Sequence, residues 1–132
     1  MMRTFTDSSE ARYEQVPWGT LAWFSDPGST GTESLVVVEV RFDPDSGHNF
    51  HRHPNQEEVI YVVEGEIEQW VGTEKRTVGA GGSAFISKNE VHASFNTSDR
   101  IARILAILGP SIGPDGYELV DVAEEEPWIS IR

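Results

Sequence analysis

Three of the four histidines in this 132-residue chain, His48, His51 and His53, lie in one short segment just before an apolar stretch. His51 and His53 are two residues apart, so in an extended segment their side chains project from the same face. Their Cα atoms would then lie about 6 to 7 Å apart, which lets both imidazoles converge on one ion. Glu57 and Glu58 follow shortly after. Because neighbours in an extended segment point in opposite directions, only one of these acids is expected to join the pair.

The fourth histidine, His92, lies in the segment VHASFN and follows the turn-forming residues Gly81, Gly82 and Asn89. The chain has no cysteine, so a metal would have to be held by imidazole and carboxylate groups. Three imidazoles and one carboxylate suit Fe, Mn, Ni, Co, Cu or Zn better than Ca or Mg. Such a set leaves coordination positions open for substrate, water or dioxygen.

These side chains must be positioned by β-structure, because the apolar stretches are short, rich in β-branched and aromatic residues, and separated by Gly, Pro, Asn or Asp. The predicted strands cover residues 35–42, 58–64, 66–71, 83–87, 91–96 and 101–108. The predicted turns cover residues 43–47, 64–66, 72–76, 79–82 and 96–100. The last strand has the apolar content of a short buried helix, but its short length before Gly109-Pro110 favours a strand. Many short strands with tight turns predict an all-β sandwich, jelly roll or closed barrel.

A chain of this length is most simply one domain with its own hydrophobic core. The polar residues 1–15 are predicted to form a flexible arm, and the domain is expected to span residues 16–132. Its first packed segment is expected near Trp18 and Trp23. Near the other end, Trp128 is expected to dock on this domain or on a second subunit.

The segment HRHPNQEEVIYVVEG, residues 51–65, resembles the first motif of the cupin superfamily. That motif has two histidines separated by one residue, then three or four residues, a glutamate, six residues and a glycine. His51, His53, Glu58 and Gly65 stand at these positions, so the resemblance selects Glu58 rather than its neighbour as the ligand.

The segment GGSAFISKNEVHASFN, residues 81–96, resembles the second cupin motif, with His92 at its histidine position. Ser87 replaces the usual proline and Asn89 replaces the usual second glycine. Asn tolerates a left-handed backbone better than other non-glycine residues, so the turn is expected to persist. In the first motif, Asp45 stands where a glycine is usual.

The resemblance implies a double-stranded β-helix, the jelly-roll barrel of cupins. It also implies one divalent transition metal per chain (Fe, Ni, Mn, Cu or Zn) and a small-molecule substrate. The implied metal ligands are His51, His53, Glu58 and His92. His48 fits no ligand position and is predicted to lie in a solvent-exposed loop, with a role beside the ligands or in substrate gating as the alternative.

Strand alternation predicts which other side chains face the metal. The predicted inward set is mostly apolar, but it includes Gln69 and Ser94. A polar group placed inward needs a partner, which is either the substrate or the nearby backbone, so both residues are catalytic candidates together with Glu58. Asn96 is expected to fix the turn at residues 96–100. Tyr61 and Trp70 have the opposite parity and are expected to pack away from the substrate. The predicted inward residues are Ile60, Val62, Ile67, Gln69, Val71, Ser94 and Asn96.

The leading functional hypothesis from this resemblance is a metal-dependent dioxygenase of small molecules, in which Glu58 tunes the charge on the ion and serves as a base. A redox-neutral isomerase, epimerase or lyase is an alternative within enzymes. A non-catalytic ligand-binding or sensory protein with a structural metal is an alternative outside them. Metal identity and substrate are left open.

The charge balance, 10 basic against 22 acidic residues and a net charge of −12, opposes nucleic-acid binding. The sequence shows no apolar core of a signal peptide and no membrane span, so a cytoplasmic protein with no membrane partner is expected. A homodimer is expected from the family resemblance, with Trp18, Trp23 and Trp128 as candidates to cover sheet edges.

Overall fold

The computed structural model describes residues 2–132, and nearly all of its regular structure is β-strand. Within this described part of the chain, no helix is long and apolar enough to cross a membrane. The elements are β1 (Arg12–Val16), β2 (Gly19–Ser25), β3 (Val36–Phe42), β4 (Ser46–Arg52), β5 (Glu57–Glu64), β6 (Glu66–Val71), β7 (Glu74–Gly79), β8 (Ser83–Ile86), β9 (His92–Asn96), β10 (Ala102–Gly109), β11 (Val120–Asp121) and α1 (Trp128–Ile131).

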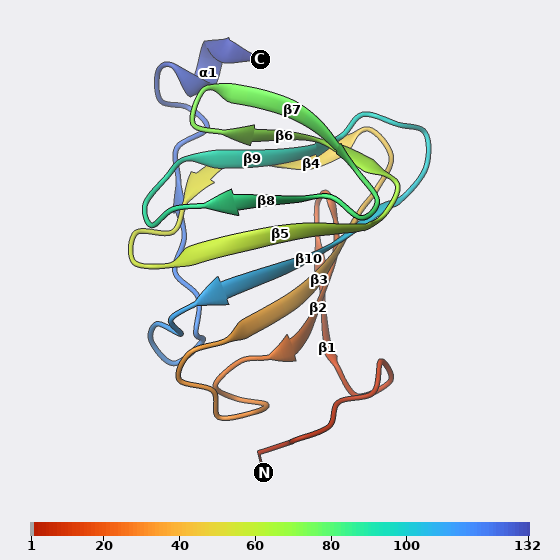
Figure 1. The fold of residues 1–132 in the computed structure, drawn as a ribbon, viewed down its shortest axis with the longest axis vertical. Coiled ribbons are helices and arrows are strands. Elements are labelled where there is room, and N and C mark those ends of the chain that lie inside the picture. The colour runs from red at the N-terminus through yellow and green to blue at the C-terminus, as the bar shows by residue number, and fades with distance from the viewer. Residues whose placement is uncertain (1) are drawn as a thin grey trace.

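The strands form two antiparallel sheets (Figure 1). The six-stranded sheet has the order β1-β2-β3-β10-β5-β8, and the five-stranded sheet has the order β11-β4-β9-β6-β7. Consecutive strands cross between the sheets, as from β3 to β4 and from β5 to β6. This arrangement confirms the predicted all-β, double-stranded β-helix fold.

The main core lies between the sheets and follows from the alternation of small and large apolar residues along the central strands. In β10, Ala102, Ile104, Ala106 and Leu108 are all buried, while the residues between them are partly exposed. The period of two identifies this stretch as a strand, which confirms the prediction over the helical alternative. Ile60, Val62 and Ile67, three of the predicted inward residues, belong to the same core.

A second apolar cluster covers the outer face of the five-stranded sheet. Phe50 of β4, Trp70 of β6 and Phe95 of β9 point outward there, and the C-terminal segment packs on them. The Trp128 ring stacks on Phe50 with centroids 5.5 Å apart, and the Arg132 guanidinium lies 3.7 Å from the Phe95 centroid. Helix α1 and the C-terminus therefore lie at the top of the barrel, away from the N-terminus (Figure 1). Trp128 docks on the chain's own domain.

The structure departs from the prediction in three polar regions. Arg12–Val16, which overlaps the end of the segment predicted to be a flexible arm, pairs with β2 as strand β1. Part of the predicted turn at residues 72–76 belongs to β7, and the predicted turn at residues 43–47 overlaps the start of β4. Strands β1 and β7 are almost entirely exposed, so their sequences carry no apolar alternation by which to recognise them.

Candidate metal centre

A β-bulge in β4 determines which of its histidines face the barrel interior. His48 pairs with Ser94 and His51 pairs with His92, so β4 advances three residues while β9 advances two. The extra residue places His48 and His51 on the same, inward face although an odd spacing separates them. Phe50 between them points to the outer cluster. The bulge therefore brings a second imidazole to the interior beside His51.

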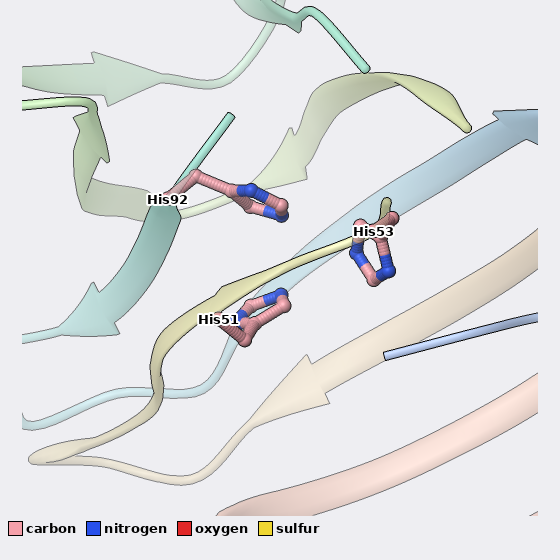
Figure 2. Close-up of side chains that lie close together, drawn as sticks. All are labelled: His51, His53 and His92. Atoms are coloured by element: carbon pink, nitrogen blue, oxygen red, sulfur yellow. The ribbon is translucent and has the colours of Figure 1, made fainter. Parts of the chain in front are cut away.

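The imidazoles of His51, His53 and His92 point toward one another (Figure 2). One ring nitrogen from each lies within 4.8 Å of those of the other two, which is a geometry that could hold a metal ion. All three side chains are buried, with exposed fractions of 4%, 2% and 1%. The three histidines that the cupin motifs imply as ligands therefore lie close enough to bind one ion.

Backbone carbonyl groups fix the orientation of each of these rings. The Nδ1 atom of His51 lies 2.6 Å from the Asn49 carbonyl oxygen, that of His53 lies 2.8 Å from the Glu118 carbonyl oxygen, and that of His92 lies 3.0 Å from the Glu90 carbonyl oxygen. A carbonyl oxygen can only accept, so each Nδ1 carries the proton. The Nε2 atom is then the ligand atom of each ring, which is the usual role of such partners around a metal.

Glu58 of β5 completes the cluster from the opposite sheet. Its Oε1 atom lies 3.2 Å from His53 Nε2 and 2.9 Å from His92 Nε2. Glu58 Oε1 and His92 Nε2 are both buried, and neither has a well-aligned hydrogen-bond partner. A cation between them would satisfy both atoms, so the donor set fits a divalent transition metal. The four residues predicted as ligands are thus brought together.

The electrostatics of the cluster keep its carboxylate ionised. Burial alone would raise the pKa of Glu58, but the close His53 and His92 imidazoles outweigh it and lower the pKa to about 2. Burial and the neighbouring imidazoles hold the pKa of His51 well below its ordinary value. For His92, burial lowers the pKa, but the Glu58 carboxylate outweighs this effect and raises it. At neutral pH the cluster thus offers a carboxylate and a neutral His51, as metal binding requires.

His48 was predicted to lie in a solvent-exposed loop, and this prediction is wrong. Its ring is partly buried and stacks on His51 with centroids 3.7 Å apart and on Trp18 with centroids 4.6 Å apart. Burial lowers its pKa to about 4. The bulge that turns His48 inward cannot be read from residue spacing, because simple alternation puts His48 and His51 on opposite faces.

The cluster opens into a narrow cavity of about 50 Å³ inside the barrel. Its polar lining consists of the four candidate ligands with His48, Ser94 and Tyr117, and it contains no Lys or Arg among the described residues. The remaining wall is apolar. It is formed by Trp18, Leu21, Trp23, Val38, Val40, Phe42, Ile60, Ile104, Ala106 and Leu108.

Gln69 and Ser94, the two inward polar candidates, bind each other. Ser94 Oγ donates to Gln69 Oε1 over 2.6 Å, and Gln69 Nε2 donates to the Trp70 carbonyl over 3.0 Å. Ser94 lines the cavity, whereas Gln69 lies behind it. A catalytic role for either residue stays a prediction, with Ser94 the better placed of the two.

Two turn predictions are confirmed. Asn96 Nδ2 donates to the carbonyls of Phe42, Asp43 and Arg100, which fixes the turn after β9. Asn89 has the left-handed φ of 64° expected at a glycine position. The Asn89 side chain also accepts a hydrogen bond from Arg52 over 2.7 Å, which ties this turn to the histidine strand.

Sequence reasoning missed the residues that support His53. The carbonyl that binds His53 belongs to Glu118, in the segment after β10, and this segment is anchored by the fully buried Gln56. Gln56 Nε2 donates to the carbonyls of Pro110 and Gly116, both over 2.9 Å, and Gln56 Oε1 accepts from Glu118 N over 3.1 Å. No local pattern marks these partners, because more than 50 residues separate them from Gln56.

The metal-free protein is expected to lose stability as the pH falls below 6.5. His48 and His51 are held neutral in the folded state, so an unfolded chain binds more protons below their ordinary pKa of 6.5. His92 acts in the opposite direction, because its raised pKa adds stability at low pH that is lost as the pH rises through that pKa. The lowered pKa of Glu58 adds stability above its ordinary pKa of 4.5, and this stability is lost as the pH falls from 4.5 to about 2.

Thermal unfolding of the metal-free protein between about pH 5 and pH 8 measures this balance. The His48→Asn variant is the matched control, because it removes one of the two depressed histidines. We expect a flatter pH dependence below 6.5 in this variant. An unchanged pH dependence in the His48→Asn variant would show that the folded protein does not hold His48 neutral.

Comparison with known proteins places the chain in a family. The model of the family described as "Cupin domain" matches residues 38–108, more than half of the chain. No curated protein sequence matches the chain.

Among solved structures, KdgF from Halomonas sp. has a TM-score of 0.72 at 21% identity over 82% of this chain and 94% of its own. The polyketide cyclase RemF from Streptomyces resistomycificus has a TM-score of 0.71 at 22% identity, over 96% of this chain and 91% of its own. The Lactobacillus farciminis oxalate decarboxylase has a TM-score of 0.74 at 18% identity, over 88% of this chain and 35% of its own. These likenesses show the fold, and together with the family match they establish that the chain belongs to the cupin family.

Proposed function

We propose that this protein is a metal-dependent enzyme that acts on a small molecule inside the barrel. The observation that carries the proposal is the set of three buried histidines whose Nδ1 atoms are held by carbonyls and whose Nε2 atoms meet beside Glu58. A bound transition metal would supply electrophilic activation of the substrate and one-electron chemistry toward dioxygen. The protein supplies an oriented ligand set and a narrow cavity with a mostly apolar wall.

The protonation states in the cavity favour a dioxygenase. Glu58 has a pKa of about 2 and His48 a pKa of about 4, while burial raises the pKa of Tyr117. The Ser94 hydroxyl is already bound to Gln69. Efficient general acid–base catalysis needs a group with a pKa near the working pH; none of these four is poised there, and His92, whose pKa is raised, is a candidate ligand. Reactivity would then depend on the metal, with the apolar wall protecting reactive species.

The lining of the cavity also indicates the charge of the substrate. A buried anion needs a cationic or hydrogen-bonding partner, but no Lys or Arg lines the cavity among the described residues, and Glu58 is ionised. A single divalent ion would have to balance Glu58 and every charge of the substrate. We therefore expect a neutral molecule, or one with a single acidic group that binds the metal directly, rather than a dicarboxylate.

Elemental analysis and oxygen uptake test this proposal. Untagged protein purified without metal-affinity resin is expected to carry about one iron, nickel, copper or manganese per chain. The metal-loaded protein is then offered enediols, β-diketones and flavonols, with oxalate as the dianionic comparison. We expect oxygen consumption with at least one neutral substrate and none with oxalate. A metal-loaded protein that consumes no oxygen with any of them would remove the support for a dioxygenase.

A redox-neutral lyase, isomerase or cyclase is the second candidate, and one observation favours it. The ionised Glu58 carboxylate lines the cavity beside the three imidazoles, so it could accept a proton from a substrate instead of serving as a permanent ligand. Solved structures with this fold include proteins named as a polyketide cyclase and an oxalate decarboxylase. This candidate predicts activity under strict anaerobiosis with zinc or manganese in the site.

The expected homodimer stays a prediction, and we propose the outer face of the six-stranded sheet as its interface. Val37, Ile107, Val59 and Phe85 lie side by side across β3, β10, β5 and β8, and Phe85 is 56% exposed. Such an exposed apolar row is a feature of interaction surfaces. A two-fold axis through the row would bury the same residues of both copies.

Light scattering at micromolar concentration is expected to give twice the chain mass of 14.7 kDa. The Phe85→Glu variant should be monomeric, because it would place a charge inside the proposed interface. The Ile129→Glu variant is the control, because Ile129 is equally exposed, at 55%, but lies in α1. A monomeric wild-type protein would reject the dimer.

A further inference from the structure

A large cleft lies outside the metal cavity and shares a wall with it. The cleft has a volume of about 760 Å³ and is formed by β1, β2 and the segments around residues 26–29 and 114–117. Leu21, Trp23 and Tyr117 line both the cleft and the cavity. These three side chains therefore stand between open surface and the candidate metal ligands.

Tyr117 is the member of this wall that contacts a candidate ligand. Its ring lies against the His53 imidazole, with centroids 5.1 Å apart, and packs edge-on against Trp23, with centroids 5.6 Å apart. Its hydroxyl makes no hydrogen bond to any residue of the described chain. Rotation of this side chain would break no hydrogen bond, so it costs only packing contacts.

The backbone on both sides of Tyr117 is held in place. The Gly116 carbonyl and the Glu118 amide are both bound to Gln56, and the Glu118 carbonyl is bound to His53. A Cβ atom at Gly116 would lie 2.6 Å from Pro27 Cδ, so this position is tightly packed as well as left-handed. The segment cannot swing away without releasing His53, so a change of access at this point would come from rotation of the Tyr117 side chain.

We propose that Tyr117 is an aromatic gate: the outer cleft is the route by which molecules reach the metal centre, and the Tyr117 ring decides what can pass. This inference rests on the proposed function for the role of the cavity, but it concerns access and requires no particular reaction. Rotamer changes of single side chains are fast, so the gate acts as a filter for size and does not limit turnover.

The charged residues around the cleft also select molecules by the sign of their charge. Glu10, Glu14, Asp26 and Asp115 line it against two arginines, Arg3 and Arg12. The Arg12 guanidinium is paired with Asp26 over 3.0 Å and lies 3.9 Å from Glu14. The cleft is therefore net acidic, which disfavours anions before they meet the gate. This route therefore favours neutral and cationic molecules over anions.

Chemical modification of His53 in metal-free protein tests the gate without metal or substrate. Diethyl pyrocarbonate reacts with the free Nε2 of neutral imidazole, and peptide mass spectrometry reports the rate at His53. We expect Tyr117→Ala to raise this rate at least about tenfold, because it removes the ring that covers His53. Tyr117→Phe should stay within about twofold of wild type, since the hydroxyl has no partner. Tyr61→Ala is the matched control, because Tyr61 lies outside the barrel and is 41% exposed.

A destabilised variant would also react faster, so a variant with the opposite effect is needed. Tyr117→Trp enlarges the ring, and we expect it to slow modification of His53 below the wild-type rate, which unfolding cannot do. An unchanged rate in Tyr117→Ala, or a rate in Tyr117→Trp as fast as that in Tyr117→Ala, would overturn the gate. Because the readout involves no metal, these rates stand whether or not the proposed enzyme activity is found.

Discussion

The His51→Ala/His53→Ala double variant is expected to bind no metal at neutral pH and to lose all metal-dependent activity. Only His92 and Glu58 of the four candidate ligands would remain, and they come from different sheets. Loss of a partner that merely orients a ligand costs about 10- to 100-fold in metal affinity, so loss of two ligands should exceed that range for each of them. Elemental analysis and titration with Co²⁺, followed by visible absorption, measure the effect.

The double variant is expected to remain folded, because neither histidine belongs to the two apolar clusters that hold the sheets together. The His53 side chain does bind the Glu118 carbonyl, and its loss should cost about 1 kcal/mol. His48→Ala is the matched control. It removes a neighbouring imidazole that stacks on His51 without being a candidate ligand, so its metal content should equal that of wild type.

The unfolding temperatures of the same two proteins distinguish a catalytic metal from a structural one. If the metal is structural, its removal from the wild-type protein should lower the unfolding temperature strongly, and the double variant should be equally unstable without any activity to lose. If it is catalytic, the apolar core carries the stability, and both metal-free proteins should unfold at similar temperatures. Metal retained by the double variant would contradict the assignment of these ligands.

Most strands with an apolar face could be predicted from the sequence, and the exposed ones could not. β2 and β4 are exceptions, because both carry a buried aromatic residue and neither was predicted as a strand. β3, β5, β6, β8, β9 and β10 each carry an alternation that the core imposes, so their positions agree with prediction to within one residue. Strands β1 and β7 are exposed on both faces, and β7 is held by its pairing with β6 rather than by burial. Such strands exist only through a neighbour, which a single sequence does not show.

The candidate ligands were predictable for a different reason: parity in an extended segment pairs His51 with His53, and the resemblance to the two cupin motifs selects Glu58 and His92. His48 shows where parity fails, because a bulge of one residue reverses it. Gln56, Tyr117 and Glu118 show a second limit. Their importance depends on contacts between parts of the chain that are far apart in sequence, and nothing local distinguishes them from ordinary loop residues.

Gln56 therefore gives the strongest expected effect outside the ligands. The Gln56→Leu variant should leave three backbone groups without a partner, the carbonyls of Pro110 and Gly116 and the amide of Glu118. Only the bond to Gly116 is fully buried, and the other two are part-buried. An unpaired buried polar group costs about 1 to 3 kcal/mol and a part-buried one less, so a total loss of about 2 to 3 kcal/mol is expected. That loss corresponds to a fall of roughly 5 to 10 °C in the unfolding temperature, measured by calorimetry.

The variant should also weaken metal binding, by about 10- to 100-fold, because the Glu118 carbonyl that orients His53 lies on the released segment. Asn55→Ala is the matched control. Asn55 holds the same segment through Glu118, with Nδ2 donating to the side-chain carboxylate over 2.7 Å, but it is exposed. Its loss should cost well under about 1 kcal/mol and leave metal affinity unchanged.

The Gln56→Glu variant tests the hydrogen-bond acceptor and the hydrogen-bond donor of the Gln56 side chain separately. A glutamate keeps the acceptor for the Glu118 amide but replaces the donor to two carbonyls with an ionised oxygen, so it should destabilise as much as leucine does near neutral pH. At low pH the protonated carboxyl regains one donor and should recover part of the loss. A Gln56→Leu protein with wild-type unfolding temperature and metal affinity would show that the segment after β10 holds His53 without this anchor. The orientation of His53 would then have to come from its packing against Tyr117, the other contact that this segment makes with the ligand.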